Sequence, residues 1–231
     1  MSIPRSLFFL GFLIWGVGQT AQAQTKRKAH INLPDITDTL ENVLSVHEDF
    51  NFYADVPVAL ATTTFDFGLT DNWDIGLGVF NFPLDSFQDY SIPVLINVEK
   101  SITLHPRFSI LAGTNIGWAL TAKNVGNGIN SYNYITGSTL IYNINLGLGA
   151  YYANQWFAGY NSVGISGNLI VPINNRWKLQ YDFLSGTNNI SGSNYQFFYS
   201  LSHDTSLGFG IQMQYNNRQE VLSGILSINY R

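Results

Sequence analysis

The chain has 231 residues, of which 11% are charged and 15% aromatic, and it contains no cysteine. Soluble domains carry about 25% charged residues, so this composition argues against a fully hydrated surface, and the missing cysteines exclude disulfides and a lipid-modified N-terminal cysteine. The formal net charge is −4 at pH 7, and the only dense basic run is at residues 26–28, so we do not expect nucleic acid as a partner.

The first 23 residues have the features of a secretory signal peptide. Arg5 precedes an apolar run over residues 7–17, and the small-x-small sequence Ala21-Gln22-Ala23 follows. We expect cleavage after Ala23. The apolar run is shorter than the roughly 20 residues that a membrane-spanning helix needs.

Residues 24–48 are expected to form a periplasmic lead-in that contains one short helix at about 36–46. Ile36, Leu40, Val43 and Leu44 recur there at helical spacing, and Asp35 or Thr37 could cap the helix. One interpretation places this helix at the periplasmic rim, and the other places it inside the barrel as a plug. Four apolar residues on one face favour the rim.

From Asp49 to the end of the chain, apolar residues recur at every second position, which is the period of a β-strand. Twelve segments follow this pattern, with ten as the alternative if two neighbouring segments form one bent strand. The expected strands are at about 49–56, 59–69, 73–82, 90–100, 107–120, 138–152, 155–162, 165–173, 176–185, 194–202, 205–215 and 220–230.

The two faces of these segments differ in chemistry. In 138–152, Leu146 belongs to a Leu/Tyr-rich face, whereas Asn145 belongs to a face of Asn and Gly with no charge. A soluble protein would place charged residues on its wet face. An apolar face toward lipid and a small polar face toward a lumen predict an all-β, antiparallel, up-and-down transmembrane β-barrel over 49–231. Closure is required because an open sheet edge in lipid leaves backbone groups unpaired.

The connections between the segments alternate in length, as in outer-membrane barrels with short periplasmic turns and longer external loops. The expected short turns are at 69–73, 103–107, 153–156, 173–177 and 202–206. The expected longer loops include 81–89, 121–137 and 185–194. With both termini in the periplasm, the short set falls on the periplasmic side.

Tryptophan and tyrosine residues gather near the predicted strand ends, where amphipathic rings favour the level of the lipid headgroups. Three tryptophans adjoin short turns and one precedes the longest expected loop, which predicts two aromatic girdles. The girdle residues are Trp73, Trp118, Trp156, Trp177, Tyr152 and Tyr230.

On this pattern, residues 49–231 resemble a bacterial outer-membrane β-barrel protein of the porin-like or transporter kind. The stretch "FDFGLTDNWDIGLGV" at 65–79 is similar to a hairpin of the phenol-degradation channel family. The resemblance implies passive passage of small solutes, no cofactor, and contact with outer-membrane lipid and the barrel-assembly machinery. Such barrels usually end on an aromatic residue, whereas this chain ends "SINYR", with Tyr230 before Arg231.

No nucleophile elbow, phosphate loop or metal-spaced His/Cys set is present, so we expect neither an enzyme nor a metal site. His203-Asp204 with Ser206 contains triad residue types, but they lie too close together on one turn to build the required geometry. The histidines fall before the predicted barrel or in predicted turns: His30, His47, His105 and His203.

The pattern places a small set of charged residues on the lumen face, and five of the six are acidic. Asp66 and Asp74 are expected to lie diagonally across one hairpin. Either basic residues pair with these acids and close the periplasmic end, or the acids form a constriction that selects cations or polar solutes. The lumen candidates are Asp55, Asp66, Asp74, Glu99, Lys178 and Asp182, and the candidate basic partners are Lys178, Lys100, Arg107 and Arg176.

The leading functional hypothesis is therefore a channel or transporter for passive movement of small solutes through a narrow polar lumen. The alternative is a closed structural or adhesive barrel that binds a partner through its external loops. A lipid-modifying enzyme is a third hypothesis, but it would need catalytic groups at the membrane-facing rim, and the sequence offers none.

Overall fold

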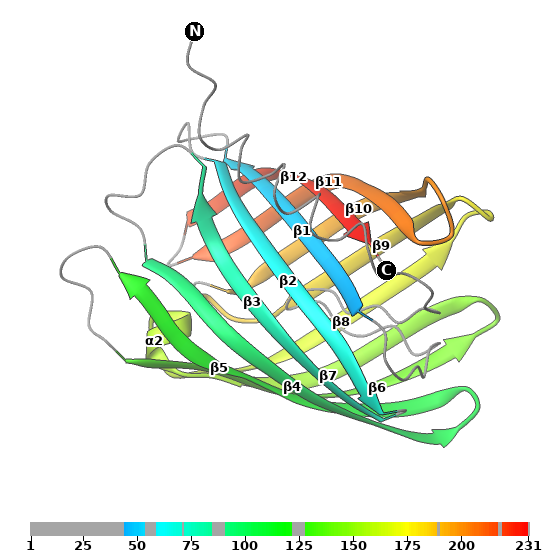
Figure 1. The fold of residues 1–231 in the computed structure, drawn as a ribbon, viewed down its shortest axis with the longest axis horizontal. Helices are drawn as coiled ribbons and strands as arrows, with labels where there is room; N and C mark the ends of the chain where they lie inside the picture. Colours follow the sequence, from blue (N-terminus) through cyan, green and yellow to red (C-terminus); the bar gives the residue numbers. More distant parts are fainter. Residues whose placement is uncertain are drawn as a thin grey trace, which may run out of the picture.

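The described residues form one closed antiparallel β-barrel of twelve strands (Figure 1). The structure is a computed structural model that describes residues 44–53, 59–70, 72–84, 91–121, 128–188, 190–216 and 219–230. The strands are β1 (Leu44–Tyr53), β2 (Ala59–Thr70), β3 (Trp73–Pro83), β4 (Ser91–His105), β5 (Phe108–Thr121), β6 (Ile129–Ile141), β7 (Ile144–Ala153), β8 (Ser162–Pro172), β9 (Trp177–Leu184), β10 (Gly192–Ser200), β11 (Thr205–Asn216) and β12 (Gln219–Tyr230). One short helix, α2 (Gln155–Ala158), connects β7 to β8.

Neighbouring strands pair in chain order, and β1 pairs with β12 to close the barrel. Val46 near the start of β1 lies opposite Tyr230 at the end of β12. The short connections after β2, β4, β6, β8 and β10 therefore lie at the same end of the barrel as the start of β1. We refer to this end as the short-turn end. Helix α2 lies at the opposite mouth (Figure 1).

The side chains alternate between the two faces of the wall as the sequence predicts. Large apolar side chains are exposed on the outside, with Leu148 67% and Ile116 46% exposed. On the inside, Asn145 is only 3% exposed and Thr136 is completely buried. An apolar outer wall around a polar interior is the arrangement that suits a barrel in lipid. The predicted fold class is confirmed, and the ten-strand alternative is wrong.

The predicted single strand at 138–152 is wrong, because the chain reverses inside it. β6 ends at Ile141, and β7 begins at Ile144 after a turn at Tyr142 and Asn143. Tyr142 has a φ of 58°, which is unusual for a residue with a Cβ atom. No Gly or Pro marks this turn, so the apolar alternation ran through it unbroken. Leu140 consequently pairs with Asn145 on the inner face.

The predicted strand at 155–162 and the predicted short turn at 153–156 are also wrong. Residues 155–158 form helix α2, and this connection lies at the mouth opposite the short turns. The predicted loop at 121–137 is shorter than expected, since β6 begins at Ile129. The strand count stays at twelve because the extra strand made by the turn at 142–143 replaces the strand lost at 155–162.

The expected helix at about 36–46 lies mostly outside the described residues, as does the predicted signal peptide. Its last positions belong to β1, which begins at Leu44 rather than near Asp49. His47 therefore belongs to the barrel wall, and the expectation that it precedes the barrel is wrong. Among the described residues, no helix has the length and apolar character needed to span a bilayer.

Candidate channel lumen

Three carboxylates gather on the inner face of neighbouring strands β2, β3 and β4. The β2–β3 register places Asp66 opposite Gly76 and Gly68 opposite Asp74, so the two aspartates lie diagonally across the hairpin. Asp74 lies directly opposite Glu99 of β4, which brings their Cβ atoms to within about 5.5 Å. All three side chains are at least nine-tenths buried. Sequence reasoning gave the diagonal pair but missed the direct pair, because it could not supply the β3–β4 register.

Glycines on the same face provide the room that this acidic group needs. A Cβ atom at Gly76 would lie 2.1 Å from Oδ1 of Asp66. One at Gly113 would lie 2.4 Å from the Tyr134 ring and 2.7 Å from Cγ of Glu99. These distances are far inside van der Waals contact. The Asn/Gly-rich face therefore lets larger polar side chains fold across the neighbouring strand.

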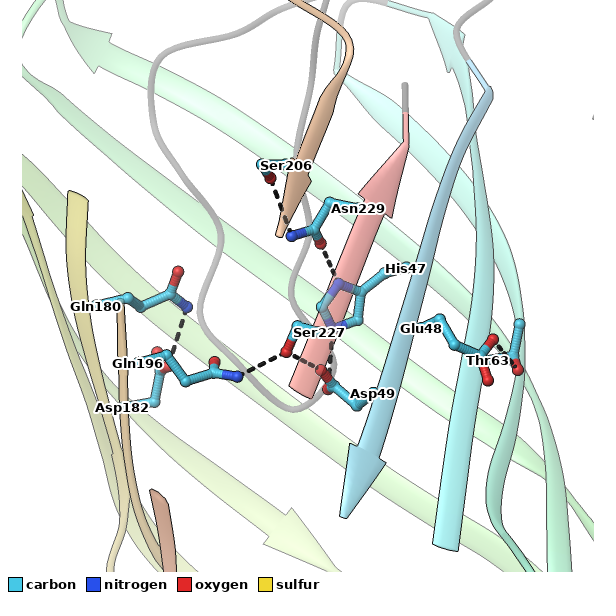
Figure 2. Close-up of polar contacts among 10 residues, drawn as sticks. All are labelled: His47, Glu48, Asp49, Thr63, Gln180, Asp182, Gln196, Ser206, Ser227 and Asn229. Atoms are coloured by element: carbon cyan, nitrogen blue, oxygen red, sulfur yellow. Dashed lines mark hydrogen bonds and ion pairs between the residues drawn. The ribbon is translucent and has the colours of Figure 1, made fainter. Parts of the chain in front are cut away.

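A second polar group crosses the seam where β1 meets β12 (Figure 2). Nε2 of His47 lies 2.9 Å from Oδ2 of Asp49, and both side chains are buried. Nδ1 of His47 hydrogen-bonds Oδ1 of Asn229, and the Ser227 hydroxyl donates to Asp49. These residues are about 180 positions apart in the chain, so only barrel closure brings them together.

Further polar side chains on the inner wall continue this group from β12 toward β10 and β9 (Figure 2). Nε2 of Gln196 on β10 donates to Oγ of Ser227 on β12 at 2.6 Å. The strand between them, β11, carries Gly210 opposite Gln196 and therefore offers no side chain to block this reach. On β9, Nε2 of Gln180 donates to Oδ2 of Asp182 at 2.9 Å. Asp182 is 6% exposed and belongs to the inner face.

His47, Asp49 and Ser227 are the residue types of a catalytic triad, but the hydrogen bonds connect them in a different order. Ser227 donates to the carboxylate of Asp49 rather than to the imidazole of His47. In a nucleophilic triad the base accepts the proton of the hydroxyl and the carboxylate orients the base. In the part of the chain that the structure describes, no three His, Asp or Glu side chains form a metal-ligand group.

Three of the four basic residues expected to pair with the lumen acids contact other groups instead. Nζ of Lys178 lies 4.9 Å from the centre of the Phe198 ring, and Nζ of Lys100 lies 4.9 Å from that of Trp73. Arg176 donates to the Tyr199 hydroxyl at 3.0 Å. Arg107 is exposed in the turn between β4 and β5. Within the described residues, none of these four cations forms an ion pair with a lumen acid.

At the mouth opposite the short turns, α2 folds over the inner side of the wall. Phe157 of α2 reaches Phe80 of β3 with ring centres 5.9 Å apart, and Tyr132 of β6 with ring centres 6.0 Å apart. Ala158 is completely buried with Leu184 of β9 in the same cluster. Each such aromatic pair contributes about 0.5–1.5 kcal/mol beyond area burial. We call the group of Phe80, Tyr132, Phe157, Ala158 and Leu184 the cap.

Hydrogen bonds connect residues on either side of helix α2 to the loop between β9 and β10. Asn188 is completely buried and donates to the hydroxyls of Tyr151, at 3.0 Å, and Ser162, at 2.6 Å. The hydroxyls of Tyr160 and Thr187 lie 2.8 Å apart and join the segment after α2 to the β9–β10 loop. These bonds hold the loop and the α2 segment together over one side of the mouth.

The predicted girdle residues lie near both ends of the barrel. Trp73 and Trp177 begin β3 and β9 at the short-turn end, and Tyr230 ends β12 there. Trp118, 60% exposed, and Tyr152 lie toward the other end. Trp156 belongs to α2, so its expected position beside a short turn is wrong.

His203 is an exposed turn residue beside Asp204, and Asp55 lies outside the described residues.

Comparisons with known proteins support the fold. The chain is similar to the solved structure of the KdgM porin, with a TM-score of 0.61 at 10% identity over 81% of this chain and 98% of that chain. It is also similar to the NanC porin, with a TM-score of 0.59 at 12% identity over 82% and 100% of the two chains. A KdgM structure in complex with disordered oligogalacturonate gives a TM-score of 0.57 at 10% identity, covering 81% and 98% of the chains.

This chain has the fold of an outer-membrane porin. No family model and no curated protein sequence matches it, so the likeness is one of architecture. The porin-type barrel, with its apolar outer wall, belongs in a bacterial outer membrane. Lumen side chains tune the selectivity of such barrels, and the described inner wall of this one carries carboxylates on two sides.

Proposed function

We propose that this barrel is a passive outer-membrane channel that favours small cations and neutral polar solutes over anions. The observation that carries the proposal is the charge on the inner face of the described strands. Five carboxylates face inward, against one lysine and one histidine. The acids are Asp49, Asp66, Asp74, Glu99 and Asp182, and the basic residues are Lys178 and His47.

The physical basis is the field of carboxylates inside a low-dielectric wall. Such walls focus the field, raise the local concentration of cations and lower that of anions. The KdgM porin has been solved with oligogalacturonate, a chain of negatively charged sugar acids. The inward acids of this chain would repel a polyanion of that kind.

The test is the reversal potential of the purified protein in a planar bilayer across a KCl gradient. The wild type is expected to prefer K⁺ over Cl⁻, and the double variant Asp74→Asn with Glu99→Gln should show a much weaker preference. The preference should also fade toward 1 M salt, where the Debye length is about 3 Å.

The matched control is Asp204→Asn, which removes one carboxylate from a turn outside the lumen and should leave the reversal potential unchanged. Anion preference in the wild type would contradict the proposal. A potential that the double variant does not change would mean that these two carboxyl groups are neutralised in the working protein.

A closed structural or adhesive barrel is the second candidate, and the cap favours it. Phe157 contacts Phe80 and Tyr132 across the mouth, and the loop of Asn188 is bonded over Tyr151. Absence of any conductance in the wild type, together with normal insertion, would favour this candidate over the channel.

A further inference from the structure

One rung of the inner wall, next to the cap, carries two buried side-chain oxygens that have no hydrogen-bond partner among the described residues. On β8, β9 and β10 the register places Asn168, Asp182 and Asn194 directly opposite one another. Residues in such positions on one face have Cβ atoms about 4.5–5.5 Å apart. The rung therefore brings one carboxylate and two side-chain amides together on three adjacent strands.

The carboxylate of Asp182 is only half satisfied by the residues that the structure describes. Its Oδ2 atom accepts from Gln180, but its Oδ1 atom is buried and has no hydrogen-bond partner among them. Oδ1 of Asn194 is also buried and has no hydrogen-bond partner among the described residues. The side chain of Asp182 is 6% exposed, and a buried acceptor left without a partner costs about 1–3 kcal/mol, more when it is charged.

The neighbouring positions hold the rung in shape without supplying a cation. Gly147 of β7 lies opposite Asn168, and a Cβ atom there would come within 2.2 Å of Oδ1 of Asn168. On the other side, Gln212 of β11 lies opposite Asn194. Lys178, four residues before Asp182 on the same strand, is placed over the Phe198 ring.

We propose that the rung of Asn168, Asp182 and Asn194 binds a monovalent metal cation of the K⁺ class. Carboxylate and amide oxygens are the ligands that hard cations take in proteins, and a single carboxylate balances a single positive charge. The role of this site in permeation rests on the proposed function. The rung is a binding site in the lumen at which a permeating cation exchanges part of its hydration shell for protein oxygens.

The rung lies between the short-turn end of the barrel and the cap. Asp182 is two residues from Leu184, which belongs to the cap, and both side chains are on the inner face. A cation entering from the short-turn end reaches Asp182 before it meets the cap. The ion is therefore held on the lumen side of the cap.

The first experiment measures single-channel conductance of the wild type as KCl is raised. A permeating ion that binds in the pore makes conductance saturate, and we expect saturation in the wild type but a nearly linear rise in Asp182→Asn. The control Asp204→Asn removes a carboxylate from an exposed turn outside the lumen, and its conductance should still saturate. Equal saturation in the wild type and Asp182→Asn would overturn the site.

The second experiment does not depend on conduction, and its expected result is obtained with the wild type alone. Wild-type crystals soaked in Tl⁺, which mimics K⁺, should give an anomalous peak between Asp182 and Asn194. No peak there, with an infrared signature of a protonated carboxyl that disappears in Asp182→Asn, would mean that a proton satisfies the rung, and would overturn the proposal.

Different results would contradict the proposed channel and the proposed cation site. A wild type with cation preference but no Tl⁺ peak and no Asp182-dependent saturation retains the proposed function and loses the ion site. A non-conducting wild type that still gives the Tl⁺ peak retains the ion site and loses the channel.

Discussion

Ile116→Arg is expected to reduce the amount of assembled barrel strongly. Ile116 lies near the middle of β5, is 46% exposed on the outer wall, and pairs with Ile96, which is 44% exposed on the same face. An arginine facing lipid near the bilayer midplane costs about 2–4 kcal/mol. That is a large part of the roughly 5–15 kcal/mol by which folded proteins are stable. The measurement is the heat-modifiable folded fraction in isolated outer membranes.

The matched control is Asn115→Arg, one residue earlier in the same strand. Asn115 lies opposite Asn97 on the inner face, beside the acids of β3 and β4, where water and carboxylates can accommodate a guanidinium group. The assembled fraction of this variant should stay close to that of the wild type. Equal loss in both variants would contradict the assignment of the two faces.

Phe157→Ala is expected to widen the mouth and to raise single-channel conductance several-fold. The Phe157 ring is the part of α2 that contacts both Phe80 and Tyr132, and β3 and β6 are separated by two strands in the wall. Its removal takes away the group that connects these two parts of the mouth. Phe157 is partly buried, so its truncation should cost less than the roughly 3–5 kcal/mol of a fully buried Phe→Ala, and the helix should detach more readily from the wall.

The control for the cap is Trp156→Ala, on the same helix. Trp156 is 47% exposed, and its loss removes a larger ring without breaking the contact between Phe157 and Phe80. Conductance and the size limit for neutral sugars should then resemble the wild type. If Phe157→Ala leaves both quantities unchanged, the cap does not limit passage.

The sequence by itself determined the class of fold and the facing of most residues. The period of two, the rarity of charge and the Asn/Gly composition of one face are local properties of each strand, so no knowledge of strand pairing is needed to interpret them. Asp66, Asp74, Glu99 and Asp182 were placed on the inner face in this way, and the structure has them there.

The boundaries around residues 138–162 could not be predicted for a local reason. The turn at Tyr142 and Asn143 has no Gly or Pro, and the apolar residues Leu140 and Ile141 on its first side hide the change of face. Helix α2 has only four residues, fewer than the periodic pattern of a helix requires. Its stability comes from the packing of Phe157 and Ala158 in the cap rather than from propensity.

Only the tertiary structure decided which side chains meet. His47 contacts Asn229 across 182 positions because β1 pairs with β12 when the barrel closes. Glu99 meets Asp74, and Asp182 lies between Asn168 and Asn194, because the registers of neighbouring strands align them. Register depends on the packing of whole strands, and a shift of one residue would exchange the two faces. The alternation therefore shows which residues face the lumen, and barrel closure determines which of them act together.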